Sequence, residues 1–233
     1  MKLPTITVPK YNVTIPTSGE LVSFRPFLVK EEKALLMSLE SEDVSNVLNS
    51  LKDIITNCTF GVVDPEKLPL AEMCYLFLNI RAKSVGETAE PALTCMGCEE
   101  TNYIEVDLTS LEIVQNEKHT KKLELGDGKG IVMRYPTLAM ESNFTSQMFS
   151  PDNLKFAAEC IDSIYDGDNV YKHTDYSLDE LVEFLEGLTH SQFEKILEFF
   201  DTMPKLQHIA EFNCKKCDLK NRIVLEGIRD FFL

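Results

Sequence analysis

Four of the seven cysteines lie in two similar short segments whose spacing suits a metal ion. Cys95 and Cys98 fall within "LTCMGCEETNYIEVDL", and Cys214 and Cys217 fall within "FNCKKCDLKNRIVLEGI". Each segment has an apolar lead-in, a Cys-x-x-Cys, a short polar turn and an alternating run typical of a β-strand. A Cys-x-x-Cys at a tight turn supplies two thiolates, and two such turns complete the tetrahedron that zinc prefers. The spacing therefore predicts one structural zinc site built from all four cysteines.

Other uses of these cysteines stay open. A thioredoxin-like redox site expects a strand before the Cys-x-x-Cys and a helix after it, whereas a β-type run follows both pairs here. Thiols that have lost an ancestral metal are a further alternative. His208 lies close before Cys214 and could substitute as a ligand, although a surface histidine is the simpler interpretation.

The two pairs are separated by 115 residues, from Cys98 to Cys214. Loop-closure entropy grows only logarithmically with loop length, so this distance along the chain does not exclude a shared site. A shared site would fix both ends of the intervening segment to one β platform.

Composition limits the class of partner. Of the 233 residues, 44% are hydrophobic and 26% charged, which is typical of a soluble globular protein. The 38 acidic residues against 23 basic ones give a formal charge of −15. This balance argues against binding to nucleic acid or to an anionic membrane surface, and favours a basic protein partner. The N-terminus lacks a secretory pattern and no apolar run is long enough to span a membrane. We therefore expect a reducing cytosol, where paired cysteines more often bind metal than form disulfides.

The pattern of apolar residues predicts an α+β protein: a small β platform carrying the paired zinc knuckles, with a large helical insertion. We expect one interrupted domain with four parts. They are an extended N-terminal arm or hairpin at 1–29, a helical segment at 30–89, the platform at 90–136 together with 210–233, and the helical insertion at 137–209. The N-terminal part could be an edge hairpin packed on the rest, or an arm that adds a strand to a neighbouring subunit.

Local signals predict several elements. Two amphipathic helices are expected within 30–58, with Ser41 capping the second, and a buried helix is expected from Leu70. Cys58 and Cys74 are predicted to be core thiols. The glycine-rich "GDGKG" at 126–130 predicts a hairpin turn rather than a phosphate loop.

The later helical part carries start signals. Pro151 is expected to begin a helix that continues through "NLKFAAECIDSIYDG". Ser177 with Glu180, and Ser191 with Glu194, match capping boxes. Three aromatic residues are predicted to pack in the core or face a partner: Phe193, Phe199 and Phe200. No nucleophile elbow, metalloprotease helix or dinucleotide loop is present, so we do not expect an enzyme.

Three long segments resemble the baseplate hub assembly proteins of T4-like contractile-tailed phages: "FRPFLVKEEKALLMSLES", "LPLAEMCYLFLNIRAKSVGE" and "FFDTMPKLQHIAEFNCKKC". "VTIPTSGE" and "GIVMRYP" extend the resemblance over most of the chain. The resemblance implies a non-enzymatic role in assembly of the central hub of the tail baseplate, with other hub proteins or the tape-measure protein as partners. Members of this family often bear the paired knuckles, which here are Cys95/Cys98 and Cys214/Cys217.

Two roles stay distinct within this resemblance. The protein could be a hub subunit that remains in the virion tail. Alternatively, it could be a transient chaperone, present in the host cytoplasm during assembly, that holds the tape-measure or other hub proteins and then leaves. The segment "RPFLVKEEKALLM" is a candidate contact surface, with an ordinary core helix as the alternative. A zinc-ribbon module that binds nucleic acid is a third hypothesis, which the negative charge disfavours.

Overall fold

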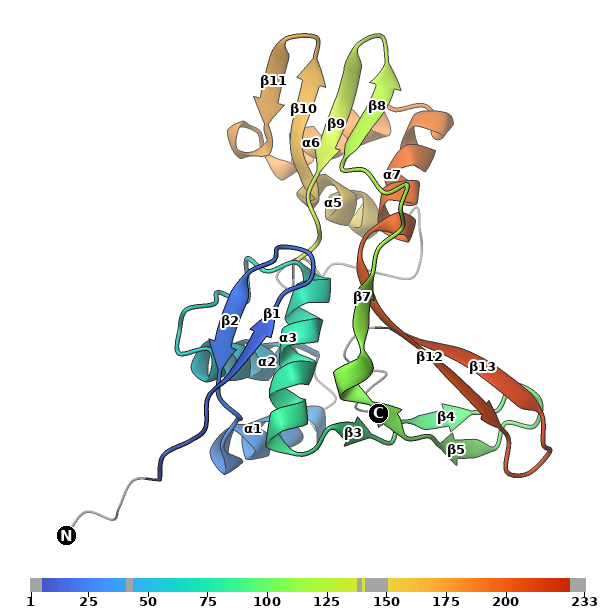
Figure 1. Ribbon diagram of the computed structural model, residues 1–233. Helices are drawn as coiled ribbons and strands as arrows, with labels where there is room; N and C mark the ends of the chain where they lie inside the picture. Colours follow the sequence, from blue (N-terminus) through green and yellow to red (C-terminus); the bar gives the residue numbers. More distant parts are fainter. Residues whose placement is uncertain (1–5, 41–43, 138–139, 141–150, 227–233) are drawn as a thin grey trace. The chain divides into compact units, whose positions relative to one another are not determined.

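The computed structural model describes residues 6–40, 44–137, 140 and 151–226 of the chain. Helices and small antiparallel sheets are both present, so the fold is α+β (Figure 1). The chain forms two compact units. Unit 1 joins Met1–Val114 to Lys205–Leu233, and unit 2 is Gln115–Pro204. Unit 2 is thus inserted into unit 1.

Unit 1 opens with an antiparallel hairpin of β1 (Tyr11–Thr14) and β2 (Leu21–Phe24). Its inward side chains are deeply buried, with Ile15 at 1% exposure and Phe24 at 2%. The hairpin therefore packs on its own unit, as in the edge-hairpin alternative. Residues 6–10, which precede the hairpin, form no strand.

Three helices follow in unit 1: α1 (Val29–Glu40), α2 (Val44–Cys58) and α3 (Leu70–Ser84). Helix α3 is buried on most sides, and Met73, Leu76 and Phe77 are fully inaccessible. Cys58 and Cys74 are buried core thiols, as predicted. Ser41, the predicted cap of the second helix, lies outside the described residues.

A partly buried ion pair joins the hairpin to α1. Arg25 Nη2 lies 2.8 Å from Glu31 Oε1, and Arg25 Nη1 donates to Glu31 Oε2 at 2.9 Å. The Leu28 N–H also donates to Glu31 Oε2, at 2.7 Å. Because Arg25 directly follows β2 and Glu31 lies in the first turn of α1, this pair fixes the angle between the two elements.

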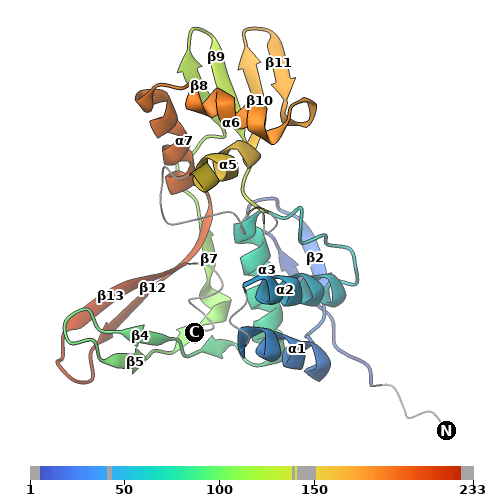
Figure 2. The same ribbon diagram turned by 180° about the vertical axis from the view of Figure 1, so that it is seen from behind.

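The remaining strands of unit 1 build a platform. They are β3 (Thr88–Ala89), β4 (Ala92–Thr94), β5 (Thr101–Tyr103), β6 (Val106–Asp107), β7 (Glu112–Val114), β12 (Lys205–Asn213) and β13 (Lys220–Glu226). β3 pairs with β6, β4 with β5, and the third sheet has the order β13-β12-β7. The β12–β13 ribbon and the β4–β5 hairpin lie side by side in both views (Figures 1 and 2). Lys205 pairs with Val114, so the chain leaves unit 1 and returns to it through neighbouring strands.

Unit 2 packs helices on a four-stranded antiparallel sheet of order β11-β10-β9-β8. Its strands are β8 (Lys122–Gly126), β9 (Lys129–Met133), β10 (Ile161–Asp166) and β11 (Asn169–Lys172), and its helices are α5 (Pro151–Glu159), α6 (Leu178–Glu186) and α7 (His190–Thr202). Phe193 and Phe199 are buried in the core between sheet and helices, and Phe200 packs against it, which confirms their predicted core role.

Two local predictions for unit 2 are confirmed. Ser177 and Glu180 form both hydrogen bonds of a capping box at the start of α6. Asp127 and Gly128 form the two-residue turn between β8 and β9, with positive φ angles of 52° and 74°. Two consecutive positive φ angles are typical of the type I′ turn that suits a tight hairpin.

Two other predictions are wrong. α7 is capped by Thr189 with Gln192, not by Ser191 with Glu194, because Gln192 occupies the third helical position and reaches back to the Thr189 N–H at 2.9 Å. The helix that begins at Pro151 ends at Glu159, and the residues after it form strand β10.

The boundaries of the units also differ from the expected parts. The segment 137–209, expected to be helical, contains the strands β10 and β11, while β8 and β9 from the expected platform belong to unit 2. The physical reason is that β8–β11 form one sheet, so their backbone hydrogen bonds are satisfied together.

Candidate metal centre

The two Cys-x-x-Cys segments fold into the same turn. In the first, the Glu99 N–H donates to the Cys95 carbonyl at 3.0 Å, and in the second the Asp218 N–H donates to the Cys214 carbonyl at 2.9 Å. Glu99 and Asp218 occupy the same place in the two turns, and both have a φ of 58°. A positive φ is uncommon for residues other than glycine, so its repetition shows that both knuckles adopt one demanding conformation.

The two turns bring the four predicted cysteines together. Their sulfur atoms all lie within 4.8 Å of one another. Cys95 Sγ lies 3.7 Å from Cys217 Sγ, and Cys98 Sγ lies 3.6 Å from Cys214 Sγ. A tetrahedral site with metal–sulfur bonds of about 2.3 Å has sulfur–sulfur edges of about 3.8 Å. The cluster thus has the donor set and the spacing that a four-thiolate zinc site requires.

The described residues contain no other His, Cys, Asp or Glu group of this kind. His208 lies in β12 and is not part of the cluster, so the structure does not bring this alternative ligand to the four sulfurs.

Two asparagines bind across the centre from one knuckle to the other. Asn102 accepts the Lys215 N–H through Oδ1 at 2.9 Å, and its Nδ2 donates toward Cys214 Sγ at 3.8 Å. Asn221 accepts the Met96 N–H through Oδ1 at 3.0 Å. Its Nδ2 donates toward Cys95 Sγ at 3.5 Å.

Each asparagine is also held by its own knuckle. Asn102 Nδ2 donates to the Glu100 carbonyl, and Asn221 Nδ2 donates to the Leu219 carbonyl, both at 2.8 Å. Asn102 is 4% exposed and Asn221 2% exposed. Buried amides with their polar atoms satisfied on both knuckles fix the register of the two turns.

Sequence reasoning missed these two residues, although a signal was present. Both asparagines follow the first cysteine of their knuckle by seven positions, so the full repeat is Cys-x-x-Cys-x-x-x-Asn. Each asparagine falls in a β-type run at an inward-facing position, where a polar side chain needs a partner.

Backbone amides stabilise negative charge on Cys95 and Cys214, the two buried cysteines of the cluster, which are called the inner cysteines below. The Gly97 N–H, 3.4 Å from Cys95 Sγ, is the main cause that lowers the pKa of Cys95 to about 6. The pKa of Cys214 is also lowered, first by the Cys217 N–H and then by the Lys216 N–H. Because metals bind the thiolate form, these amides prepare both sulfurs for a metal ion.

The outer cysteine Cys98 behaves differently. The Glu100 N–H acts to lower the pKa of Cys98, but burial and the other three sulfurs outweigh it and raise this pKa to about 12. Four sulfurs this close cannot all be negative without a cation, so Cys98 retains its proton in the metal-free protein. A divalent metal would supply the missing positive charge.

Charged side chains join the knuckles at the surface. Glu100 lies 3.5 Å from Lys215 Nζ and 3.3 Å from Lys216 Nζ, and these lysines, Lys216 first, lower its pKa. Exposed ion pairs contribute little stability individually. They do occupy the two lysines that a nucleic-acid-binding ribbon would need.

A comparison with known protein families places this chain. The model of the T4 bacteriophage base plate protein family matches residues 8–233. The chain belongs to this family. Searches of curated proteins and of solved structures each gave no significant match. The resemblance found in the sequence to T4-like phage baseplate proteins is confirmed at the level of the family. No helix within the described residues is long and apolar enough to cross a membrane.

Proposed function

We propose that this baseplate-family protein acts in assembly of the central hub of the phage tail baseplate, by binding other hub proteins or the tape-measure protein. The observation that carries the proposal is the family match over residues 8–233. The narrower hub role is supported by the segments 24–41, 68–87 and 199–217, which resemble hub assembly proteins. Such a role needs no catalysis, and its place is the host cytoplasm during assembly and then the virion tail.

A structural zinc ion is part of the proposal, with Cys95, Cys98, Cys214 and Cys217 as ligands. Four thiolates fill a tetrahedral zinc, so no position is left for a reacting water molecule. The zinc would join the β4–β5 hairpin to the β12–β13 ribbon and would close unit 1 on both sides of the inserted unit 2. The division of the chain into a knuckle platform and an insertion is therefore part of the same proposal.

One surface of α1 supports a binding role. Leu35 of this helix is buried at 5% exposure, while Leu36 is 54% exposed and Met37 60% exposed. Val29 at the start of the helix is 80% exposed. Residues seven or eight apart lie on one side of a helix, so these three apolar side chains share the outer side of α1. Exposed apolar residues that lie together mark contact surfaces more often than scattered ones do.

The binding role is tested by complementation of a phage that lacks this gene. The double variant Leu36→Ser/Met37→Ser is expected to reduce the yield of complete tails at least tenfold, because it removes the outer apolar surface of α1. Val62→Ser, at a 79% exposed residue outside α1, is the matched control and should leave the yield unchanged. Electron microscopy of the arrested particles then checks the hub itself: particles with intact hubs would contradict the proposal.

A transient chaperone of the tape-measure or other hub proteins is the second candidate. It is favoured by the acidic, solvent-exposed side of α6 and α7, which includes Glu183, Glu186, Glu194 and Glu198. Quantitative mass spectrometry of purified virions and of assembly intermediates separates the two roles. A fixed copy number in finished virions identifies a hub subunit, whereas presence in intermediates alone identifies a chaperone.

The nucleic-acid-binding alternative has a simple test. Retention on heparin at low salt is expected to be weak, because Lys215 and Lys216 are paired with Glu100 and the chain carries a charge of −15. Tight retention that falls steeply with salt would revive this alternative.

A further inference from the structure

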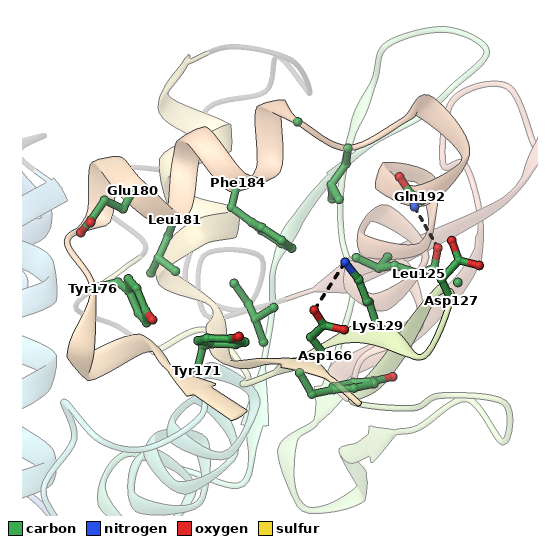
Figure 3. Close-up of a pocket in the computed structure, with 16 residues that line it drawn as sticks. Leu125, Asp127, Lys129, Asp166, Tyr171, Tyr176, Glu180, Leu181, Phe184 and Gln192 are labelled. Atoms are coloured by element: carbon green, nitrogen blue, oxygen red, sulfur yellow. Dashed lines mark hydrogen bonds and ion pairs between the residues drawn. The ribbon is translucent and has the colours of Figure 1, made fainter. Parts of the chain in front are cut away.

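Unit 2 contains a groove on the helix-covered face of its sheet (Figure 3). The groove has a volume of about 640 Å³ and lies between the β8–β9 and β10–β11 hairpins, α6 and the start of α7. On the same face Leu123 and Ile131 are buried beneath the helices, whereas Leu125 and Ile164 further along are only partly buried. The helices therefore leave part of an apolar sheet face uncovered.

Apolar side chains line the helical side of the groove, and two tyrosines line one end. Leu181, Phe184 and Leu188 extend the apolar surface from the helical side. Tyr171 and Tyr176 lie at one end, with ring centroids 6.3 Å apart and an edge-to-face orientation. They are 39% and 40% exposed, so both rings still offer surface to a ligand.

The charges around the groove are mainly negative. Asp127, Asp166 and Glu180 line it against a single cation, Lys129, and that lysine lies 3.4 Å from Asp166. Within the described residues, neither Asp127 nor Glu180 has an ion-pair partner. Glu180 accepts the Ser177 N–H and hydroxyl through Oε2, and these bonds keep its carboxylate fixed and its pKa low.

We infer that this groove binds a short segment of a partner protein in which a lysine or arginine stands between apolar side chains. The apolar side chains would cover Leu125, Ile164 and Phe184, which removes their surface from water. The cation would lie by Glu180, within reach of the faces of Tyr171 and Tyr176. Asp127 lies at the opposite end of the groove, beside Gln192 (Figure 3), where it would favour a second basic residue of the same segment. An acidic segment would be repelled by the carboxylates that line the groove, so we expect it not to bind. That the ligand is a protein segment rests on the proposed assembly role, whereas its charge and polarity follow from the groove alone.

Two substitutions remove the charge and preserve the local structure. Glu180→Gln keeps the capping box, since Gln192 performs the same role in α7. Asp127→Asn keeps a residue that favours the type I′ turn. The matched control is Glu183→Gln/Glu186→Gln, which removes two charges from α6 outside the groove.

The experiment measures binding of labelled synthetic hexapeptides to the full chain by fluorescence anisotropy at physiological salt. The probes alternate leucine with arginine, leucine with glutamate, and serine with arginine. We expect the leucine–arginine peptide alone to bind, and the Asp127→Asn/Glu180→Gln variant to weaken it at least tenfold. Tyr171→Ser/Tyr176→Ser should weaken it to a similar degree, while the control double variant stays within twofold of wild type.

Three outcomes would overturn the inference. They are equal loss in the control variant, equal binding of the serine–arginine peptide, and no binding of the leucine–arginine peptide at millimolar concentration. The first two would show that the overall negative charge, not the groove, attracts the peptide. None of them bears on the hub role, because α1 and the cysteine cluster are unchanged in every variant.

Discussion

Asn102 and Asn221 make equivalent hydrogen bonds in opposite directions, each from its own knuckle to the backbone and the inner sulfur of the other. The two turns are therefore related by an approximate twofold axis that passes through the centre of the four-sulfur cluster. Because each amide spans both knuckles, neither turn has its full set of hydrogen bonds without the other.

These reciprocal hydrogen bonds predict that the two asparagines increase the affinity of the cluster for zinc. Asn102→Ala or Asn221→Ala should weaken zinc binding by about 10–100-fold, the usual effect of losing a partner that orients a metal ligand. Asn221→Asp should weaken it further, since a carboxylate replaces the N–H donor beside a thiolate. Zinc competition with a coloured chelator measures the affinity. Asn213→Ala, at an exposed position of β12, is the control, and an equal loss there would contradict the role.

Metal content is the direct test of the cysteine cluster. Mass spectrometry of the untagged protein should find one zinc per chain, and Cys95→Ser/Cys214→Ser should abolish it. The melting temperature should fall by about 10 °C or more. This corresponds to a loss of about 3–5 kcal/mol of stability, since each kcal/mol shifts the melting temperature by about 2–4 °C in a protein of this size. Cys58→Ser, outside the cluster, should keep the metal. A metal-free wild-type protein of unchanged stability would refute the zinc site.

The partly buried Arg25–Glu31 pair predicts a loss of stability in acid. The hydrogen bond from Arg25 is the main cause that lowers the pKa of Glu31 from its ordinary value near 4.5. A carboxylate with a lowered folded-state pKa stabilises the protein fully above its unfolded-state pKa, and this contribution disappears as pH falls through the folded-state value.

Urea unfolding at a series of pH values checks this. Glu31→Gln should lower the free energy of unfolding by about 1–3 kcal/mol at pH 7, because it leaves the partly buried Arg25 without a charge partner. The difference from wild type should shrink as the pH falls below about 4.5, the ordinary pKa of a glutamate side chain. Glu40→Gln, at the exposed end of α1, should follow the wild-type curve. A pH-independent difference would exclude the ion pair as its cause.

Gly130 is predicted to tolerate no side chain. A Cβ atom there would overlap Tyr165 Oη and the Leu123 carbonyl oxygen. Since the carbonyl belongs to the neighbouring strand β8, the strands would have to separate. Gly130→Ala should destabilise unit 2 by about 2–3 kcal/mol, the cost of overpacking a core. Gly187→Ala, whose Cβ has its nearest contact at 3.4 Å, is the control in calorimetry and should be close to neutral.

Unit 2 should be removable. Val114 and Lys205 are paired across β7 and β12, so a short glycine–asparagine turn can replace residues 115–204 without stretching the chain. The shortened protein is expected to keep its zinc and to unfold cooperatively. An insoluble, metal-free product would show that the knuckles need unit 2 to meet.

The sequence predicted the helices of unit 1 and the meeting of the cysteines better than it predicted unit 2. The apolar spacing in α1–α3 reflects burial within one unit. Two matched Cys-x-x-Cys segments predict a shared metal site even when many residues separate them. By contrast, Ile161–Asp166 follows a helix without a proline or glycine between them, so the pattern favoured a longer helix. Its pairing with β9 decides the outcome, and a single sequence does not carry that contact.

The hydrogen bonds of the two asparagines show a different limit of prediction from sequence. Asn102 and Asn221 are visible as a repeat, but their partners are backbone amides of the opposite turn, which have no signature in the sequence. The groove of unit 2 is hidden for the same reason, since Tyr171, Phe184 and Leu125 come together only when α6 packs on the sheet.

The insertion of unit 2 also sets an order of events on the ribosome. Cys217 is synthesised 119 residues after Cys98, and at about 5–20 residues per second this takes roughly 6–24 s. Until Cys214 is synthesised, only two of the four cysteines are present, and the first knuckle lacks its hydrogen-bond partners from the second turn. All of unit 2 emerges before the second knuckle does. The cysteine cluster can therefore close only after all of unit 2 has been synthesised, so a closed cluster reports that the segments of unit 1 on both sides of the insertion are present.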